Sequence, residues 1–206
     1  RLKDFVYRGT IVSNADIGID SYKPADMPSA YGANNHGGFE KIKDAYYIFY
    51  HRHTNGTWFS RQACAEKIII KEDGSIPQVE MTSCGLNGGP LIGKGEYPIS
   101  IACNLFTDKP SVYIDATCPK ITQDGRDQED GTPLEGIENA KDTSYITQIQ
   151  TNTTIGLKYF DFKGVKKITI KTRAYMSGCF EVRTKWDGPV IGKIPIKDFS
   201  NFWENR

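Results

Sequence analysis

Short runs of aromatic and β-branched residues, each bounded by a turn signal, constrain the fold of this chain most strongly. The turn signals include "TNGT", "EDGS", "FKGV" and "WDGP", and no segment shows convincing helical periodicity. Residues 23–38 and 83–98 are rich in Gly, Pro and Asn and are predicted loops. The sequence therefore predicts an all-β fold. The predicted strands lie in "AYYIFYHRH", "EKIIIKEDGSI", "KYFDF", "KKITIKTRAY" and "CFEVRTKW".

A change in sequence texture near residues 104–110 divides the chain into two predicted domains, 1–106 and 107–206. A chain of 206 residues is long enough for one large or two small domains. A polar, acidic stretch follows the boundary and does not fit the spacing of a calcium-binding EF-hand loop. A solvated loop is the favoured interpretation, and a single calcium site is the alternative. The acidic residues are Asp124, Asp127, Glu129, Asp130, Glu135 and Glu138.

The charges of the chain balance, with 26 basic and 25 acidic residues, so its overall field attracts neither nucleic acid nor an anionic membrane. No run approaches the roughly 20 apolar residues of a membrane span. The chain has no initial Met and no signal segment, and its first ten residues already read as a strand. We therefore expect that an upstream segment has been removed.

The five cysteines contain no CxxC pair, which excludes a zinc ribbon and a thioredoxin motif. Because five is an odd number, at least one thiol is free or pairs between chains. Scattered buried cysteines are the favoured interpretation. One or two disulfides in a secreted protein are the alternative, and the sequence leaves the redox compartment open.

All three histidines of the chain, His36, His51 and His53, lie within eighteen residues. In the predicted strand 45–53, alternation places His51 and His53 on one face, an arrangement that can bind zinc. No third ligand follows at a usual spacing, so a hydrogen-bonded or surface pair is favoured over a metal site. His36 lies in the glycine-rich segment "GANNHGGF", where a functional loop residue and a turn-capping residue are equally supported.

The order of motifs from "NNHGGF" through "YYIFYH", "SRQACAE" and "EDGSI" resembles the last blade of a glycoside hydrolase family 43 propeller. "VEMTSCGLNGGPL" and "YPISIACNL" resemble the closing segment of the arabinofuranosidase/xylosidase branch, and the likeness spans residues 5–105. The resemblance implies a five-bladed β-propeller. It also implies that His36 reaches the propeller axis, where it holds a calcium ion or a water beneath the substrate. The resemblance also implies that Arg61 contributes to the floor of the active site. It assigns no functional role to His51 and His53, which are then strand residues.

The resemblance further implies an inverting O-glycosidase whose catalytic carboxylates lie upstream of this chain. Such enzymes use an acid and a base carboxylate about 6.5–9.5 Å apart, and the base activates a water. In the family these residues, with a third orienting carboxylate, lie on earlier blades that this chain lacks. Asp16, Asp20 and Asp26 match no family motif, so none of them is a candidate. We therefore expect the chain to be inactive alone.

The second half resembles a carbohydrate-binding module of family 6, a jelly-roll-like β-sandwich that commonly follows family 43 catalytic domains. The matching segments are "IGLKYFDF", "GCFEVR" and "GPVIGKIPI", and the pattern stops before the last strands of the module. In such modules aromatic rings cover the apolar faces of sugars. Tyr145 and Trp203 come nearest to the platform positions. Asp115 stands where the module has an acidic residue near its first strand, which implies a contact with a structural calcium or a ligand hydroxyl. The other candidate aromatics are Tyr159, Tyr175 and Trp186.

These resemblances predict part of a secreted hydrolase, extracellular or periplasmic, that acts on arabinoxylan, xylan or arabinan. The alternative is a non-catalytic carbohydrate-binding protein in which the propeller segment is a spacer. Calcium is the expected cofactor, at the propeller axis or in the sandwich. The expected partner is plant polysaccharide, with neither nucleic acid nor membrane. Unpaired sheet edges also predict self-association.

Overall fold

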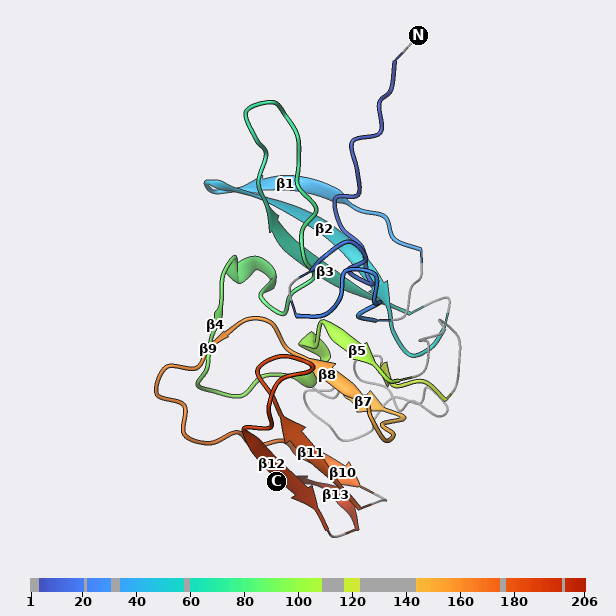
Figure 1. Ribbon diagram of the computed structural model, residues 1–206, viewed down its shortest axis with the longest axis vertical. Helices are drawn as coiled ribbons and strands as arrows, with labels where there is room; N and C mark the ends of the chain where they lie inside the picture. Colours follow the sequence, from blue (N-terminus) through green and yellow to red (C-terminus); the bar gives the residue numbers. More distant parts are fainter. Residues whose placement is uncertain are drawn as a thin grey trace, which may run out of the picture. The chain divides into compact units, whose positions relative to one another are not determined.

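The strand β2, Ala45–His53, is the centre of a three-stranded antiparallel sheet in the computed structural model (Figure 1). β1, Gly38–Ile42, and β3, Arg61–Ile68, flank it. The β2–β3 turn passes through Asn55 and Gly56, both with positive φ, a conformation that these residues adopt readily. The "TNGT" signal therefore closes this hairpin. The structure describes residues 4–20, 22–30, 34–57, 60–108, 117–122, 144–174, 177–197 and 199–206.

One face of β2 forms the core of this sheet. Alternation along the strand directs Ile48 and Tyr50 inward, where they cluster with Ile68, Met81 and Cys103. All five side chains are buried. Burying a large apolar side chain contributes about 1.5–3 kcal/mol, so this face fixes the register of the strand. His51 and His53 lie on the opposite face of β2.

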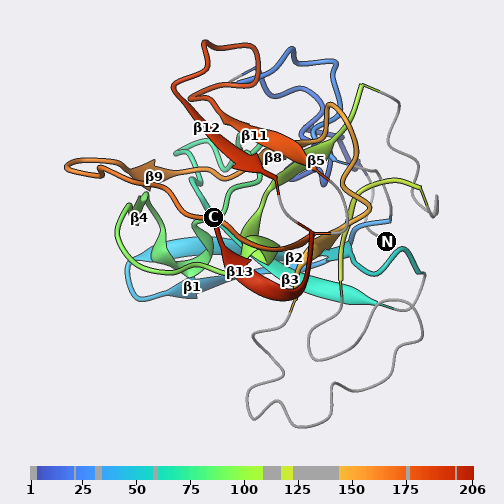
Figure 2. The ribbon, with the colours of Figure 1, turned by 90° about the horizontal axis from the view of Figure 1, so that it is seen from below.

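Shorter strands pair segments that lie far apart in the sequence. Figures 1 and 2 show β5 beside β8, which brings residues 104–106 next to residues 154–156. A second core cluster supports this pairing and contains Ala102, Leu105, Ile121 and Ile146. Two 3-10 helices, η1 (Gly85–Asn87) and η2 (Ile99–Ile101), lie in the connections. The pairs are β4 (Leu91–Ile92) parallel to β9 (Phe160–Asp161), β5 (Asn104–Phe106) antiparallel to β8 (Thr154–Gly156), and β6 (Lys120–Ile121) antiparallel to β7 (Ile146–Thr147).

The chain divides into two compact units, Arg1–Asp161 and Phe162–Arg206. The second unit has two antiparallel pairs, and Figure 2 shows the β11–β12 pair. Its large apolar side chains are mostly exposed, so this unit buries little apolar surface of its own. The strands are β10 (Lys171–Ala174) with β13 (Ser200–Asn205), and β11 (Gly178–Val182) with β12 (Gly192–Ile196). The exposed residues include Phe162, Trp186, Ile191, Phe199, Phe202 and Trp203.

The all-β prediction is confirmed, since the described residues form strands, turns and two short 3-10 helices. The five-bladed propeller and the β-sandwich stay predictions. The predicted boundary after residue 106 also stays a prediction, and it falls inside the first compact unit. All five cysteines are free thiols. No helix in the described ranges is long and apolar enough to cross a membrane.

Candidate functional site

The three histidines form a row of rings on one face of β2. The ring centroids of His36 and His51 are 4.4 Å apart, and those of His51 and His53 are 5.7 Å apart, both edge to face. Gly37 makes this row possible, because a Cβ at this position would lie 1.8 Å from the carbonyl oxygen of Phe49. The glycine turn therefore brings the loop residue His36 against the strand residue His51.

The inner histidine of the row is enclosed by polar groups. His53 is 1% exposed; its Nε2 contacts Asn34 Oδ1, and its Nδ1 lies 3.3 Å from the carbonyl oxygen of Thr57. Burial lowers the pKa of His53 below its ordinary value, although the Thr57 carbonyl partly offsets this effect. The imidazole is therefore mainly neutral at pH 7, and its role is to fix the loop that carries Asn34.

The middle histidine differs because one of its nitrogens has no partner. His51 Nε2 is buried and forms no hydrogen bond with the described residues. Burial lowers the pKa of His51, and the charges of His36 and Arg61 lower it further, whereas hydrogen bonding with the backbone of His36 and Asn34 partly offsets the decrease. Arg61 lies opposite His53 in the β2–β3 ladder. The two residues predicted for the active-site floor, His36 and Arg61, therefore lie around the same imidazole.

The row does not make a metal centre by itself. Within the described part of the chain, no group of three or more His, Cys, Asp or Glu residues could hold a metal ion. The two strand histidines are engaged with each other, with Asn34 and with Thr57 rather than with a common centre. This arrangement gives the zinc hypothesis for His51 and His53 no support.

The structure places the predicted sugar-binding residues in different units. Tyr145 is half-buried in the first unit, where its N–H donates to Thr122 Oγ1 at 2.9 Å. Trp203 lies on β13 of the second unit, is 42% exposed, and has the guanidinium carbon of Arg173 5.5 Å from its ring centroid. Asp115 lies outside the described residues, as do Tyr175 and the acidic stretch.

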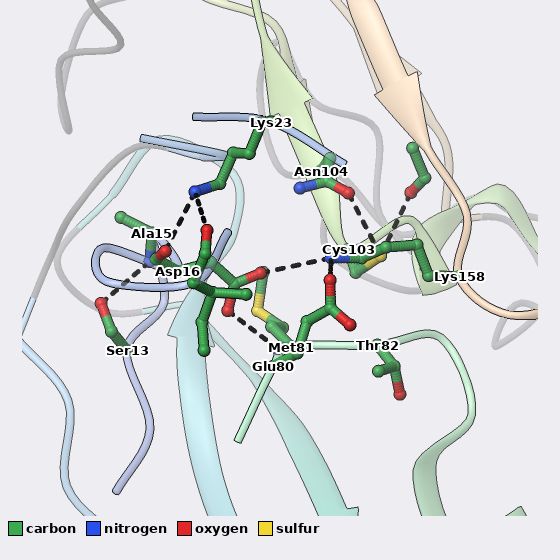
Figure 3. Close-up of polar contacts among 12 residues, drawn as sticks. Ser13, Ala15, Asp16, Lys23, Glu80, Met81, Thr82, Cys103, Asn104 and Lys158 are labelled. Atoms are coloured by element: carbon green, nitrogen blue, oxygen red, sulfur yellow. Dashed lines mark hydrogen bonds and ion pairs between the residues drawn. The ribbon is translucent and has the colours of Figure 1, made fainter. Parts of the chain in front are cut away.

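A buried ionic network in the first unit was not predicted from the sequence (Figure 3). Asp16 is fully buried, and its Oδ1 accepts a hydrogen bond from the N–H of Met81 at 2.8 Å. Lys158 Nζ lies 3.3 Å from Asp16 Oδ2 and 2.7 Å from Glu80 Oε1. The hydroxyl of Tyr159 donates to Glu80 Oε2. One lysine is thus shared between two carboxylates.

The electrostatics of this network follow from its burial. Burial raises the pKa of Asp16, although the Met81 N–H and Lys158 partly offset the increase. For Lys158, burial lowers the pKa, but Cys103, Glu80 and Asp16 more than offset burial, so the net pKa is raised. Lys158 is therefore a cation at neutral pH. No sequence signal identifies the network, because 142 and 78 residues separate Lys158 from its two partners.

Comparison with known proteins found a long relative. Over 208 residues, which include 98% of this chain, the chain is 55% identical to a protein of Thermoclostridium stercorarium named "Xylosidase/arabinosidase". The chain spans 41% of the length of that relative. No protein-family profile matches the chain. No solved structure matches it either.

Proposed function

We propose that this chain is part of a glycoside hydrolase that cleaves arabinofuranosyl or xylosyl linkages in plant polysaccharides. The observation that supports this proposal is the 55% identity, over nearly the whole chain, to a protein named xylosidase/arabinosidase. The all-β structure is compatible with it. Arabinoxylan, xylan and arabinan are the proposed substrates, and an extracellular or periplasmic location follows from substrates of this size.

In finer detail, we propose that the first half is the C-terminal part of a five-bladed, family 43 propeller with an inverting mechanism. The chain spans 41% of its relative, which leaves room for catalytic carboxylates elsewhere in the complete protein. His36 and Arg61 are proposed for the floor of the active site. The exposed position of His36, next to a neutral imidazole and an arginine, supports a role in orienting a substrate hydroxyl or a water.

Calcium at His36 is also part of this proposal. Calcium takes about six to eight oxygen ligands, whereas the ring of His36 packs against the imidazole of His51. The described residues around His36 therefore do not fit a calcium ion by themselves. Any calcium at this position would depend on oxygen ligands from the rest of the protein, so no catalytic step is derived through it.

A carbohydrate-binding role for the second half is proposed on the exposed aromatics of residues 162–206. Trp203 offers an indole ring that is 42% exposed on a strand, a surface suited to the apolar face of a sugar. The same surface supports the alternative function, a non-catalytic carbohydrate-binding protein. Self-association through sheet edges stays part of both proposals.

The test is release of nitrophenol from nitrophenyl α-L-arabinofuranoside and nitrophenyl β-D-xyloside. The 206-residue chain and the complete protein from the same gene are assayed side by side. We expect turnover by the complete protein and none by the folded 206-residue chain. Turnover by the short chain contradicts the upstream location of the carboxylates. No turnover by the complete protein refutes the hydrolase and favours the binding protein.

A further inference from the structure

A cavity of about 270 Å³ lies in the first unit, beside the ionic network. It shares Glu80 and Tyr159 with that network. The cavity is separate from the histidine row. Lys67 of β3 lines the cavity. Arg61, which lies beside the histidines, is six residues earlier on the same strand. Six residues of a strand span about 20 Å. The lining residues are Glu66, Lys67, Val79, Glu80, Thr82, Cys84, Gly85, Gly88, Gly89, Pro90 and Tyr159.

Glycines give this cavity its open wall. Gly88 has a φ of 67°, and a Cβ there would lie 2.6 Å from the hydroxyl oxygen of Tyr47. The next residue, Gly89, differs, because a Cβ there meets no atom within 4 Å. At Gly88 the backbone itself therefore forms the wall of the cavity, because a side chain there would clash with Tyr47. At Gly89 the backbone also forms the wall, but a side chain could be accommodated there.

The polar groups of the cavity are fixed in place before any ligand arrives. Glu66 is 5% exposed and accepts hydrogen bonds from Tyr50 Oη at 3.2 Å, Thr82 N–H at 2.6 Å and Thr82 Oγ1 at 2.7 Å. Glu80 is fixed by Lys158 and Tyr159. Each carboxylate oxygen offers about two lone-pair sites, and Glu66 Oε2 accepts one hydrogen bond from the described residues, so this oxygen can also accept from a ligand.

The charges of the lining favour a neutral ligand. Glu80 is compensated by Lys158 at 2.7 Å, and Lys67 adds a cation to the rim of the same cavity. Burial raises the pKa of Glu66 to about 7, so this carboxyl group is partly protonated at neutral pH. The cavity therefore presents hydrogen-bond acceptors without the strong net charge that selects an ion.

The volume limits the size of the ligand. Pockets for drug-sized molecules have volumes of roughly 300–1,000 Å³, and this cavity lies just below that range. Val79, Pro90 and the ring of Tyr159 add apolar surface to its polar groups. A ring with hydroxyl groups on its edge and C–H groups on its face matches this combination.

We propose that this cavity binds one neutral sugar unit, whose hydroxyl groups donate to Glu66 and Glu80 while its C–H face lies against Val79, Pro90 and Tyr159. The choice of a sugar among small polyols rests on the proposed function. The site is a binding site remote from the histidine row, where a sugar released or presented by the enzyme can be retained.

The test uses the complete protein and free D-xylose and L-arabinose as probes in isothermal titration calorimetry. Gly89 lines the cavity and a Cβ there meets no atom within 4 Å, so Gly89→Leu adds a bulky side chain at the cavity wall, and we expect sugar binding at one site to weaken about tenfold or more. Gly38→Leu is the matched control, because a Cβ there also meets no atom within 4 Å and Gly38 does not line the cavity. It should leave binding unchanged.

Hydrolysis of the nitrophenyl glycosides separates this proposal from the proposed function. Unchanged kcat and KM with weakened sugar binding in Gly89→Leu support both. Titration curves of Gly89→Leu that superimpose on those of the parent protein refute the cavity site while hydrolysis stands. If Gly89→Leu loses sugar binding and the parent protein hydrolyses neither glycoside, the cavity site is supported and the proposed hydrolase function is refuted. If Gly89→Leu misfolds, Gly89→Ala adds one methyl group to open space and should weaken binding by a smaller factor.

Discussion

Lys158 Nζ lies 2.7 Å from Glu80 Oε1, although 78 residues separate the two along the chain. The same nitrogen lies 3.3 Å from Asp16 Oδ2, so a single side chain joins three distant segments of the first unit. Removing one partner of a buried ion pair costs about 3–5 kcal/mol, because it leaves an uncompensated charge. Removing this lysine is therefore expected to cost more than breaking an exposed ion pair among the described residues, such as Lys193–Glu181.

Replacing Lys158 tests this conclusion directly. Lys158→Met keeps the aliphatic volume but leaves Asp16 and Glu80 without their cation, and we expect the free energy of unfolding to fall by about 3–5 kcal/mol. Lys193→Met is the control, since Lys193 is 64% exposed in its pair with Glu181 and should change stability by less than about 1 kcal/mol. Urea denaturation measures both; equal midpoints for the two variants contradict the prediction.

Glu66 predicts a dependence of stability on pH. Burial raises its pKa from 4.5 to about 7, so between these values the folded protein binds the proton more tightly than the unfolded chain does. The free energy of unfolding therefore falls as the pH rises from 4.5 to about 7. Glu66→Gln lacks this titration, and its stability relative to the parent should rise by up to about 3 kcal/mol across the window.

The readout for this prediction is denaturation at several pH values, compared between the variant and the parent so that other titrating groups cancel. Glu72→Gln, at an exposed position, serves as the matched control and should show no such trend. A stability difference that stays constant from pH 4.5 to 7 for Glu66→Gln is the outcome that rules the titration out.

His36 should matter for turnover more than for stability. Its side chain is exposed, so His36→Ala removes little buried surface, whereas the proposed active-site floor loses a polar group. In the complete protein we expect kcat to fall about tenfold or more, with little change in melting temperature. Glu40→Ala, at another exposed position four residues away, should retain activity. Full activity of His36→Ala removes this residue from the site.

Trp203 should contribute to polysaccharide binding. Stacking of an aromatic ring on a sugar predicts that Trp203→Ala migrates faster than the parent protein in a native gel that contains arabinoxylan. Trp186→Ala is the comparison, because Trp186 is also 42% exposed but is a candidate that comes less near to a platform position than Trp203. Migration of the parent protein that is unaffected by arabinoxylan counts against the binding module, and equal effects of the two variants count against Trp203 as its platform.

The sequence predicted those parts of the fold that depend on local pattern. The strand expected over residues 45–53 is β2, and "TNGT" forms its turn, because alternation and turn chemistry are properties of neighbouring residues. The strand expected over 166–175 is shorter, since β10 starts at Lys171. It pairs with β13, and the register shifts between Thr172 and Ala174.

For the candidate site, the role of the residues selected from the sequence stays a prediction, and the structure shows only where they lie. His36 and Arg61 were selected from motifs, and both lie around His51. Asp16 was noted as an acidic residue without a motif, and Glu80 and Lys158 were not selected at all. Their interaction depends on contacts across 78 and 142 residues, which neither periodicity nor a short motif reports.

The position of Lys158 also has a consequence for synthesis. At about 5–20 residues per second, a ribosome adds Lys158 roughly 7–28 s after Asp16, because 142 residues separate them. Until then the carboxylates of Asp16 and Glu80 lack the lysine whose ammonium group contacts both of them. The ionic network of the first unit can therefore be completed only after nearly the whole of that unit has been synthesised.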